Sequence, residues 1–131
     1  MSRIKTTYLD QAFYNSSLAE GPELESYVEP FAHTPSTGGT AIDAAGTVYN
    51  SDTDSQRIIA IAPNGTMATL VQDSRLLWVD AMWIDTRQRL WLPAAQLNRG
   101  VPFGDGTNRI VKPLLVFTLQ LDVGPPANDH A

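Results

Sequence analysis

Cysteine is absent from the 131-residue chain, which excludes disulfide bonds and thiolate metal sites. Long apolar runs are also absent, because no stretch approaches the ~18 consecutive apolar residues of a membrane-spanning helix. Residues 1–7 contain positive charges, but no apolar segment follows them, so we expect no signal peptide in this chain. The sequence therefore predicts a protein without a membrane partner and leaves its redox environment open.

Positive charge is scarce. The chain has 9 Lys and Arg residues against 14 Asp and Glu residues, which gives a net charge of −5. The basic residues are scattered instead of forming a patch, so we expect no nucleic-acid partner. Sequence motifs of catalysis are lacking too, since no HExxH, P-loop, paired-carboxylate spacing or Ser/His/Asp order appears. No catalytic residue is therefore assigned, and the balance is against an enzyme.

The residues that are present favour an all-β fold. Hydrophobic residues make up 43% of the chain, enough for a core, and 9 Gly and 9 Pro suit a protein with many turns. A length of 131 residues fits one domain. We therefore expect a single all-β domain over residues 1–131.

One hairpin pattern occurs twice. Residues 41–49 and 83–91 both read as any residue, Ile, Asp, four turn residues, an aliphatic residue and an aromatic residue. The aspartates of the two copies, Asp43 and Asp85, are about 42 positions apart, inside the ~40–50-residue range of propeller blades. We interpret both as turn carboxylates that accept hydrogen bonds from backbone N–H groups. The repeat predicts antiparallel sheets arranged as blades of a partial β-propeller.

The expected elements follow this pattern along the chain. Alternating β-branched residues predict a strand over residues 2–9, interpreted as the last strand of a preceding blade, and then a polar loop over residues 10–17. A short helix is expected near residues 22–28. Four strands predict a complete blade over residues 38–73. Residues 77–122 predict a last blade that lacks its fourth strand.

Several short runs resemble a known family. The most specific covers residues 70–78, Leu-Val-Gln-Asp-Ser-Arg-Leu-Leu-Trp, and further matches cover residues 3–9, 39–43, 64–73 and 95–97. Together they look like the C-terminal part of the major royal jelly protein/yellow family, chiefly its fungal and microbial members, with distant similarity to regucalcin/gluconolactonase propellers. The resemblance implies an extracellular, six-bladed β-propeller, of which this chain supplies about two blades. Two blades leave open sheet edges, so we expect self-association through those edges.

The resemblance also implies a binding site at the mouth of the propeller channel. Asp80 lies where the innermost strand of the last blade begins, and a small organic ligand is expected beside it. His33, Thr37 and Gln96 are further candidate ligand-binding residues, since each lies just before or just after a predicted strand. Their alternative interpretations are a surface histidine, a turn or strand hydroxyl, and an amide that bonds the next loop.

A divalent metal ion is the alternative ligand at Asp80. In the lactonase-type propellers that the hairpin resembles, an aspartate at the matching place binds the ion, and Ca²⁺ or Zn²⁺ would be the candidate. The corresponding place in the first copy of the repeat is Gly38, which has no ligand side chain. A further interpretation needs no ligand, because the Asp80 carboxylate can cap backbone N–H groups where a strand starts. No other cofactor is expected.

Three functions thus follow as alternatives. The first is a ligand-binding propeller of the royal jelly/yellow class. The second is a metal-dependent, lactonase-like hydrolase in which the ion activates water. The third is a truncated product without activity of its own.

Overall fold

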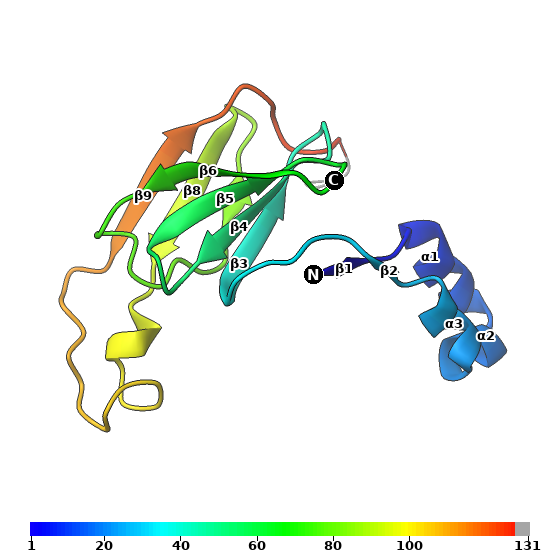
Figure 1. The fold of residues 1–131 in the computed structure, drawn as a ribbon, viewed down its shortest axis with the longest axis horizontal. Helices are drawn as coiled ribbons and strands as arrows, with labels where there is room; N and C mark the ends of the chain where they lie inside the picture. The colour runs from blue at the N-terminus through cyan, green and yellow to red at the C-terminus, as the bar shows by residue number, and fades with distance from the viewer. Residues whose placement is uncertain (128–131) are drawn as a thin grey trace. The chain divides into compact units, whose positions relative to one another are not determined.

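The computed structural model describes residues 1–127, and the chain divides into two compact units. The first unit is Met1–His33, and the second begins at Thr34 (Figure 1). This division differs from the single domain that the sequence predicted. Most of the regular structure is β, in antiparallel sheets, as the composition predicted. Among the described residues, no helix is long and apolar enough to cross a membrane.

The first unit is mainly helical. Its two short strands pair antiparallel, and its elements are β1 (Ser2–Arg3), α1 (Thr6–Tyr14), α2 (Ser16–Glu20), α3 (Pro22–Ser26) and β2 (Glu29–Pro30). The helix predicted near residues 22–28 is confirmed as α3. The strand predicted over residues 2–9 is wrong beyond Arg3, and the loop predicted over residues 10–17 is wrong, because α1 and α2 occupy these positions.

Packing explains why α1 forms despite its β-branched residues. Thr6 and Thr7 favour strands by their intrinsic propensity. Tyr8 and Ala12, however, are four residues apart and therefore share one face of a helix. The Tyr8 ring stacks on Tyr27 with 3.9 Å between ring centroids, and Ala12 is buried. Burial within this unit outweighs the local preference.

The second unit begins with a four-stranded antiparallel sheet. Its strands, in spatial order, are β3 (Thr37–Ile42), β4 (Val48–Asp52), β5 (Arg57–Ile61) and β6 (Met67–Gln72). Gly46 and Gly65 have φ angles of 82° and 85° and allow the tight turns of the first and last hairpins. The four strands predicted between residues 38 and 73 are confirmed.

A three-stranded antiparallel sheet follows. Pairing continues on the N-terminal side of its first strand, where the Asp80 N–H donates to the Pro93 carbonyl over 3.2 Å. The short 3₁₀ helix η1 (Leu97–Arg99) lies in the long insertion before the last strand. The strands are β7 (Trp83–Ile84), β8 (Arg89–Ala94) and β9 (Leu115–Gln120), so residues 77–122 form three strands, as the sequence predicted.

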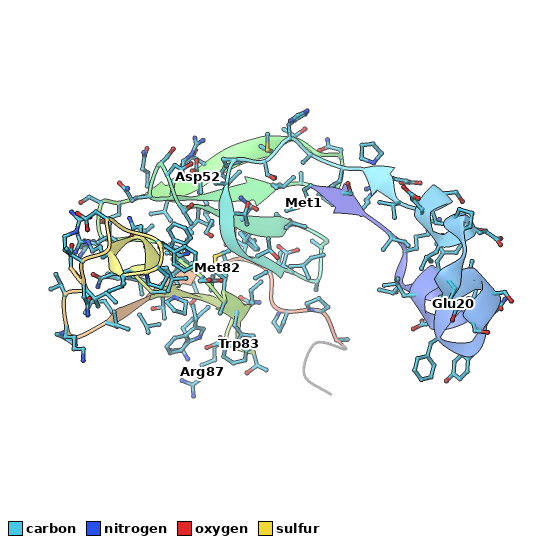
Figure 2. The ribbon with its side chains drawn as sticks, turned by 90° about the horizontal axis from the view of Figure 1, so that it is seen from below. Met1, Glu20, Asp52, Met82, Trp83 and Arg87 are labelled. Carbon is cyan, nitrogen blue, oxygen red and sulfur yellow. The ribbon has the colours of Figure 1, made fainter. Side chains whose placement is uncertain are left out.

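The main hydrophobic core lies between these two sheets, and we call the surfaces that meet there their packed faces. Met82 points into the space between the sheets, whereas Trp83 points away from the four-stranded sheet (Figure 2). Burying a Leu or Ile side chain contributes about 1.5–3 kcal/mol each. The packed faces carry Ala41, Tyr49, Ile58, Ala60 and Val71 on the four-stranded sheet and Ile84, Leu90, Leu92, Phe117 and Leu119 on the three-stranded sheet.

Candidate functional site

The first copy of the repeated hairpin is organised around a buried carboxylate. Asp43 is 2% exposed, and its Oδ1 accepts hydrogen bonds from the Ala45 and Thr47 N–H groups, both over 2.9 Å. The Tyr49 hydroxyl donates to Asp43 Oδ2 over 2.9 Å. Burial, and then the hydrogen bond to Asp43, raise the pKa of Tyr49 well above its usual value. The tyrosine therefore stays protonated and holds the turn.

The second copy repeats the backbone hydrogen bonds of this arrangement at Asp85. Asp85 Oδ1 accepts from the Arg87 and Arg89 N–H groups over 2.9 and 3.0 Å. Trp91 takes the place of the tyrosine, and its Nε1 donates to Asp85 Oδ2 over 3.0 Å. Arg89 adds an ion pair with Asp85 Oδ2, with Nη2 2.7 Å away. Both aspartates are turn carboxylates, as the sequence predicted.

Hydrogen bonding sets the charge of Asp85. Burial is the largest single influence and raises the pKa of Asp85, but donors from Arg89, Trp91 and Arg87 together outweigh it. The net effect holds the pKa of Asp85 well below its usual range. The carboxylate is therefore ionised at neutral pH and accepts the hydrogen bonds that hold the turn.

The backbones of the two sheets approach each other closely where β3 begins. Ser51 Oγ accepts hydrogen bonds from the Gly38 and Gly39 N–H groups over 3.1 and 2.9 Å, and it donates to the Val79 carbonyl over 2.8 Å. A Cβ on Gly38 would overlap the Val79 carbonyl oxygen, and a Cβ on Gly39 would lie 2.8 Å from the Ala81 nitrogen. Glycine is required at both positions because the backbone of the neighbouring sheet approaches them.

This close approach explains why Gly38, and not a residue with a ligand side chain, occupies the position in the first repeat that corresponds to Asp80. Asp80 lies beside it: Oδ1 accepts from the Ala81 N–H over 2.7 Å and would be 3.2 Å from a Cβ on Gly39. The Asp80 residue is half-buried at the end of the second sheet. The backbone-capping bond that the sequence suggested for Asp80 is present.

Thr37 lies at the first position of β3, two residues before Gly39. It is exposed, and its Oγ1 is 3.0 Å from both the Pro35 carbonyl oxygen and Asn50 Oδ1. The structure therefore brings Asp80 against the strand end that carries Thr37. His33 belongs to the first unit, where it is exposed.

Gln96 serves the long insertion. It is 5% exposed, its Nε2 donates to the Val111 carbonyl over 3.0 Å, and its Oε1 accepts from the Val111 N–H over 3.1 Å. Arg99 Nη1 adds a third bond to Oε1 over 3.2 Å. The Gln96 side-chain amide, a candidate ligand-binding group by sequence, instead holds the insertion against the end of β8 through these hydrogen bonds.

A metal site at Asp80 would need several oxygen or nitrogen ligands close together. Across residues 1–127, no group of three or more His, Asp or Glu side chains is placed to hold an ion. Asp80 therefore belongs to no such group among the residues that the structure describes.

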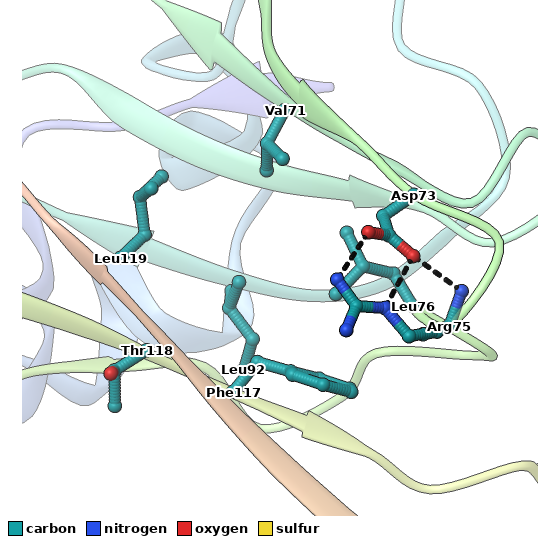
Figure 3. Close-up of a pocket in the computed structure, with 8 residues that line it drawn as sticks. All are labelled: Val71, Asp73, Arg75, Leu76, Leu92, Phe117, Thr118 and Leu119. Atoms are coloured by element: carbon teal, nitrogen blue, oxygen red, sulfur yellow. Dashed lines mark hydrogen bonds and ion pairs between the residues drawn. The ribbon is translucent and has the colours of Figure 1, made fainter.

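Sequence reasoning missed a pocket of about 140 Å³ between β6 and β9 (Figure 3). Arg75 is paired at its rim with Asp73, with Nη2 2.6 Å from Oδ2, and its guanidinium lies 5.4 Å from the Phe117 ring centroid. Hydrogen bonds from Arg75 lower the pKa of Asp73 to about 2. The lining residues are Val71, Asp73, Arg75, Leu76, Leu92, Phe117, Thr118 and Leu119.

The chemistry of this pocket is mainly apolar. Arg75 and Asp73 neutralise each other, so the rim offers neither an unpaired cation nor an unpaired anion. In the sequence, the pocket is indicated only by the Asp-Ser-Arg run within residues 70–78. Phe117, which contacts Arg75, is far away in sequence. Such a pairing appears only after the two sheets are packed together.

Comparison of the sequence with protein-family models gave no match, and a search of curated proteins gave none either. A functional assignment therefore depends on the residues and contacts described above.

Proposed function

We propose that the chain forms two neighbouring blades of a β-propeller of the major royal jelly/yellow class. In this proposal it binds a small organic molecule that carries an amine, beside Asp80 at the mouth of the channel. The observation that carries the proposal is the repeated hairpin. Asp43 and Asp85 accept hydrogen bonds from equivalent donors in two consecutive antiparallel sheets.

The arrangement of the strands supports the proposed propeller. In a propeller, the first strands of successive blades lie next to one another around a central channel. Here the first strand of the four-stranded sheet, β3, contacts the first strand of the next sheet, β7. The sheets also pack face to face through one shared core, as neighbouring blades do.

Asp80 is the group best suited to a ligand at this end of the sheets. Its Oδ1 is engaged by the Ala81 N–H, and in the described part of the chain its Oδ2 accepts no hydrogen bond. A half-buried carboxylate with one oxygen available favours an ammonium group, because charge-assisted hydrogen bonds are the stronger ones. The net charge of −5 also favours a cationic ligand.

Calorimetric titration with tyramine, an aromatic amine, tests the proposal. A hydrogen bond to a charged group contributes about 1.5–3 kcal/mol, so Asp80→Ala should weaken binding at least tenfold. Asp54→Ala is the matched control, because Asp54 is an exposed carboxylate in the β4–β5 turn and its removal changes the net charge equally. Equal affinities of the two variants, or no binding by the unaltered chain, would refute the proposed site.

A further inference from the structure

Each of the two main sheets has a second, outer face, opposite its packed face. Side chains alternate along a strand, so neighbours in sequence lie on opposite faces. Tyr49 lies on the packed face of its sheet, which places Ile42 and Val48 on the outer face. Ile84 lies on the packed face of its sheet, which places Trp91 on the outer face.

The repeat relates these faces in a particular way. Tyr49 corresponds to Trp91, so the packed face of the four-stranded sheet is equivalent to the outer face of the three-stranded sheet. Ile42 corresponds to Ile84, so the outer face of the four-stranded sheet is equivalent to the packed face of the three-stranded sheet. The two packed faces, which contact each other, are therefore equivalent by the repeat to the two outer faces. An outer face of each kind should be able to pack together in the same way.

Both outer faces expose large apolar side chains. On the four-stranded sheet, Ile42 and Met67 of the edge strands β3 and β6 are 46% and 42% exposed, whereas Ile59 and Ile61 of the inner strand β5, which share this face by register, are buried. On the three-stranded sheet, Trp83 and Val116 are 45% and 56% exposed, and Val116 shares its face with Trp91 by the register of β8 and β9. Large apolar side chains exposed on the same face of a sheet make that face a candidate interaction surface.

We propose that copies of this chain associate head to tail, with the outer face of one copy's three-stranded sheet packed on the outer face of the next copy's four-stranded sheet. The occupant is a second copy because the contact between the two sheets of one chain already shows this pairing of equivalent faces. The inference rests on the propeller arrangement proposed above, though not on its ligand.

Head-to-tail contacts are heterologous, and they form a ring when the rotation from one copy to the next closes. Propellers close with about four to eight blades. Because each copy contributes two sheets, the assembly is a ring of about two to four copies. Such a ring also covers the apolar outer faces of every copy.

Native mass spectrometry and light scattering of the full chain test the ring. The expected result is one species of two to four times 14.3 kDa. A monomeric chain at the highest soluble concentration, or an open-ended series of species, would overturn the ring. Neither result depends on Asp80, so the amine titration decides the ligand site separately.

Two variants test the polarity of the contact. Met67→Glu blocks the outer face of the four-stranded sheet, and Val116→Glu blocks that of the three-stranded sheet; each alone should be monomeric. An equimolar mixture should give a dimer with one copy of each variant, because one unaltered pair of faces remains. A mixture that stays monomeric, or a single variant that still assembles, would overturn head-to-tail association.

A matched control separates surface charge from the blocked contact. Val101→Glu places the same charge on an apolar residue that is 54% exposed in the long insertion, outside the strands of both sheets, and it should assemble like the unaltered chain. Loss of assembly in this control would overturn the assignment of the faces. Far-ultraviolet circular dichroism confirms that each variant is folded, and Ile42→Glu and Thr118→Glu are second variants on the same two faces.

Discussion

Ser51 connects the two main sheets, and its removal should destabilise the second unit strongly. The residue is 1% exposed. Its hydroxyl satisfies the Gly38 and Gly39 N–H groups and the Val79 carbonyl, which belong to different sheets. Ser51→Ala leaves these backbone groups without that partner.

The size of the effect follows from the number of groups involved. Leaving a buried donor or acceptor unsatisfied costs about 1–3 kcal/mol. Local movement of the backbone should let some of the three groups find other hydrogen-bond partners. Ser51→Ala should therefore lower the free energy of unfolding by about 2–4 kcal/mol. This is a large share of the ~5–15 kcal/mol that stabilises an ordinary domain.

Urea unfolding followed by tryptophan fluorescence measures this change. All 3 tryptophans, Trp78, Trp83 and Trp91, lie in the second unit, so the signal reports on that unit. Ser74→Ala is the matched control, because Ser74 is exposed in a turn and its loss should change stability by less than ~0.5 kcal/mol. Equal midpoints and slopes for the two variants would refute the role assigned to Ser51.

Three further predictions concern pH, the insertion and metal ions. Because folding lowers the pKa of Asp85, its stabilisation is present above the unfolded pKa of ~3.9 and is lost as pH falls; Asp85→Asn should therefore differ from the unaltered chain at pH 7 and converge with it in acid unfolding curves. Gln96→Ala should speed proteolysis within residues 97–113 while the circular dichroism of the sheets persists. In calorimetric titration with Ca²⁺ or Zn²⁺, the unaltered chain and Asp80→Ala should give the same result. Binding heat that is present in the unaltered chain and lost in Asp80→Ala would favour the lactonase-like alternative.

The second unit was largely predictable because its local signals agree with its packing. The strands between residues 38 and 73 and the three strands between residues 77 and 122 follow from alternation and turn residues. Asp43 and Asp85 were correctly interpreted because an aspartate at a tight turn accepts nearby backbone N–H groups. These interactions are local in sequence.

The rest could not be predicted because it depends on contacts between distant residues. Thr6 and Thr7 favour a strand, and only the packing of Tyr8 on Tyr27 shows why the segment is helical. The bridging role of Ser51 becomes visible only when Val79 is placed beside it. Propensity contains no information on either neighbour.

NMR spectroscopy can locate the ligand on the chain. Tyramine should be titrated into the ¹⁵N-labelled chain while amide chemical shifts are followed. We expect the largest, saturable shifts at Gly39, Asp80 and Ala81, where the four-stranded sheet meets the three-stranded sheet. Shifts centred instead on Val71 and Phe117, in the pocket between β6 and β9, would contradict this location.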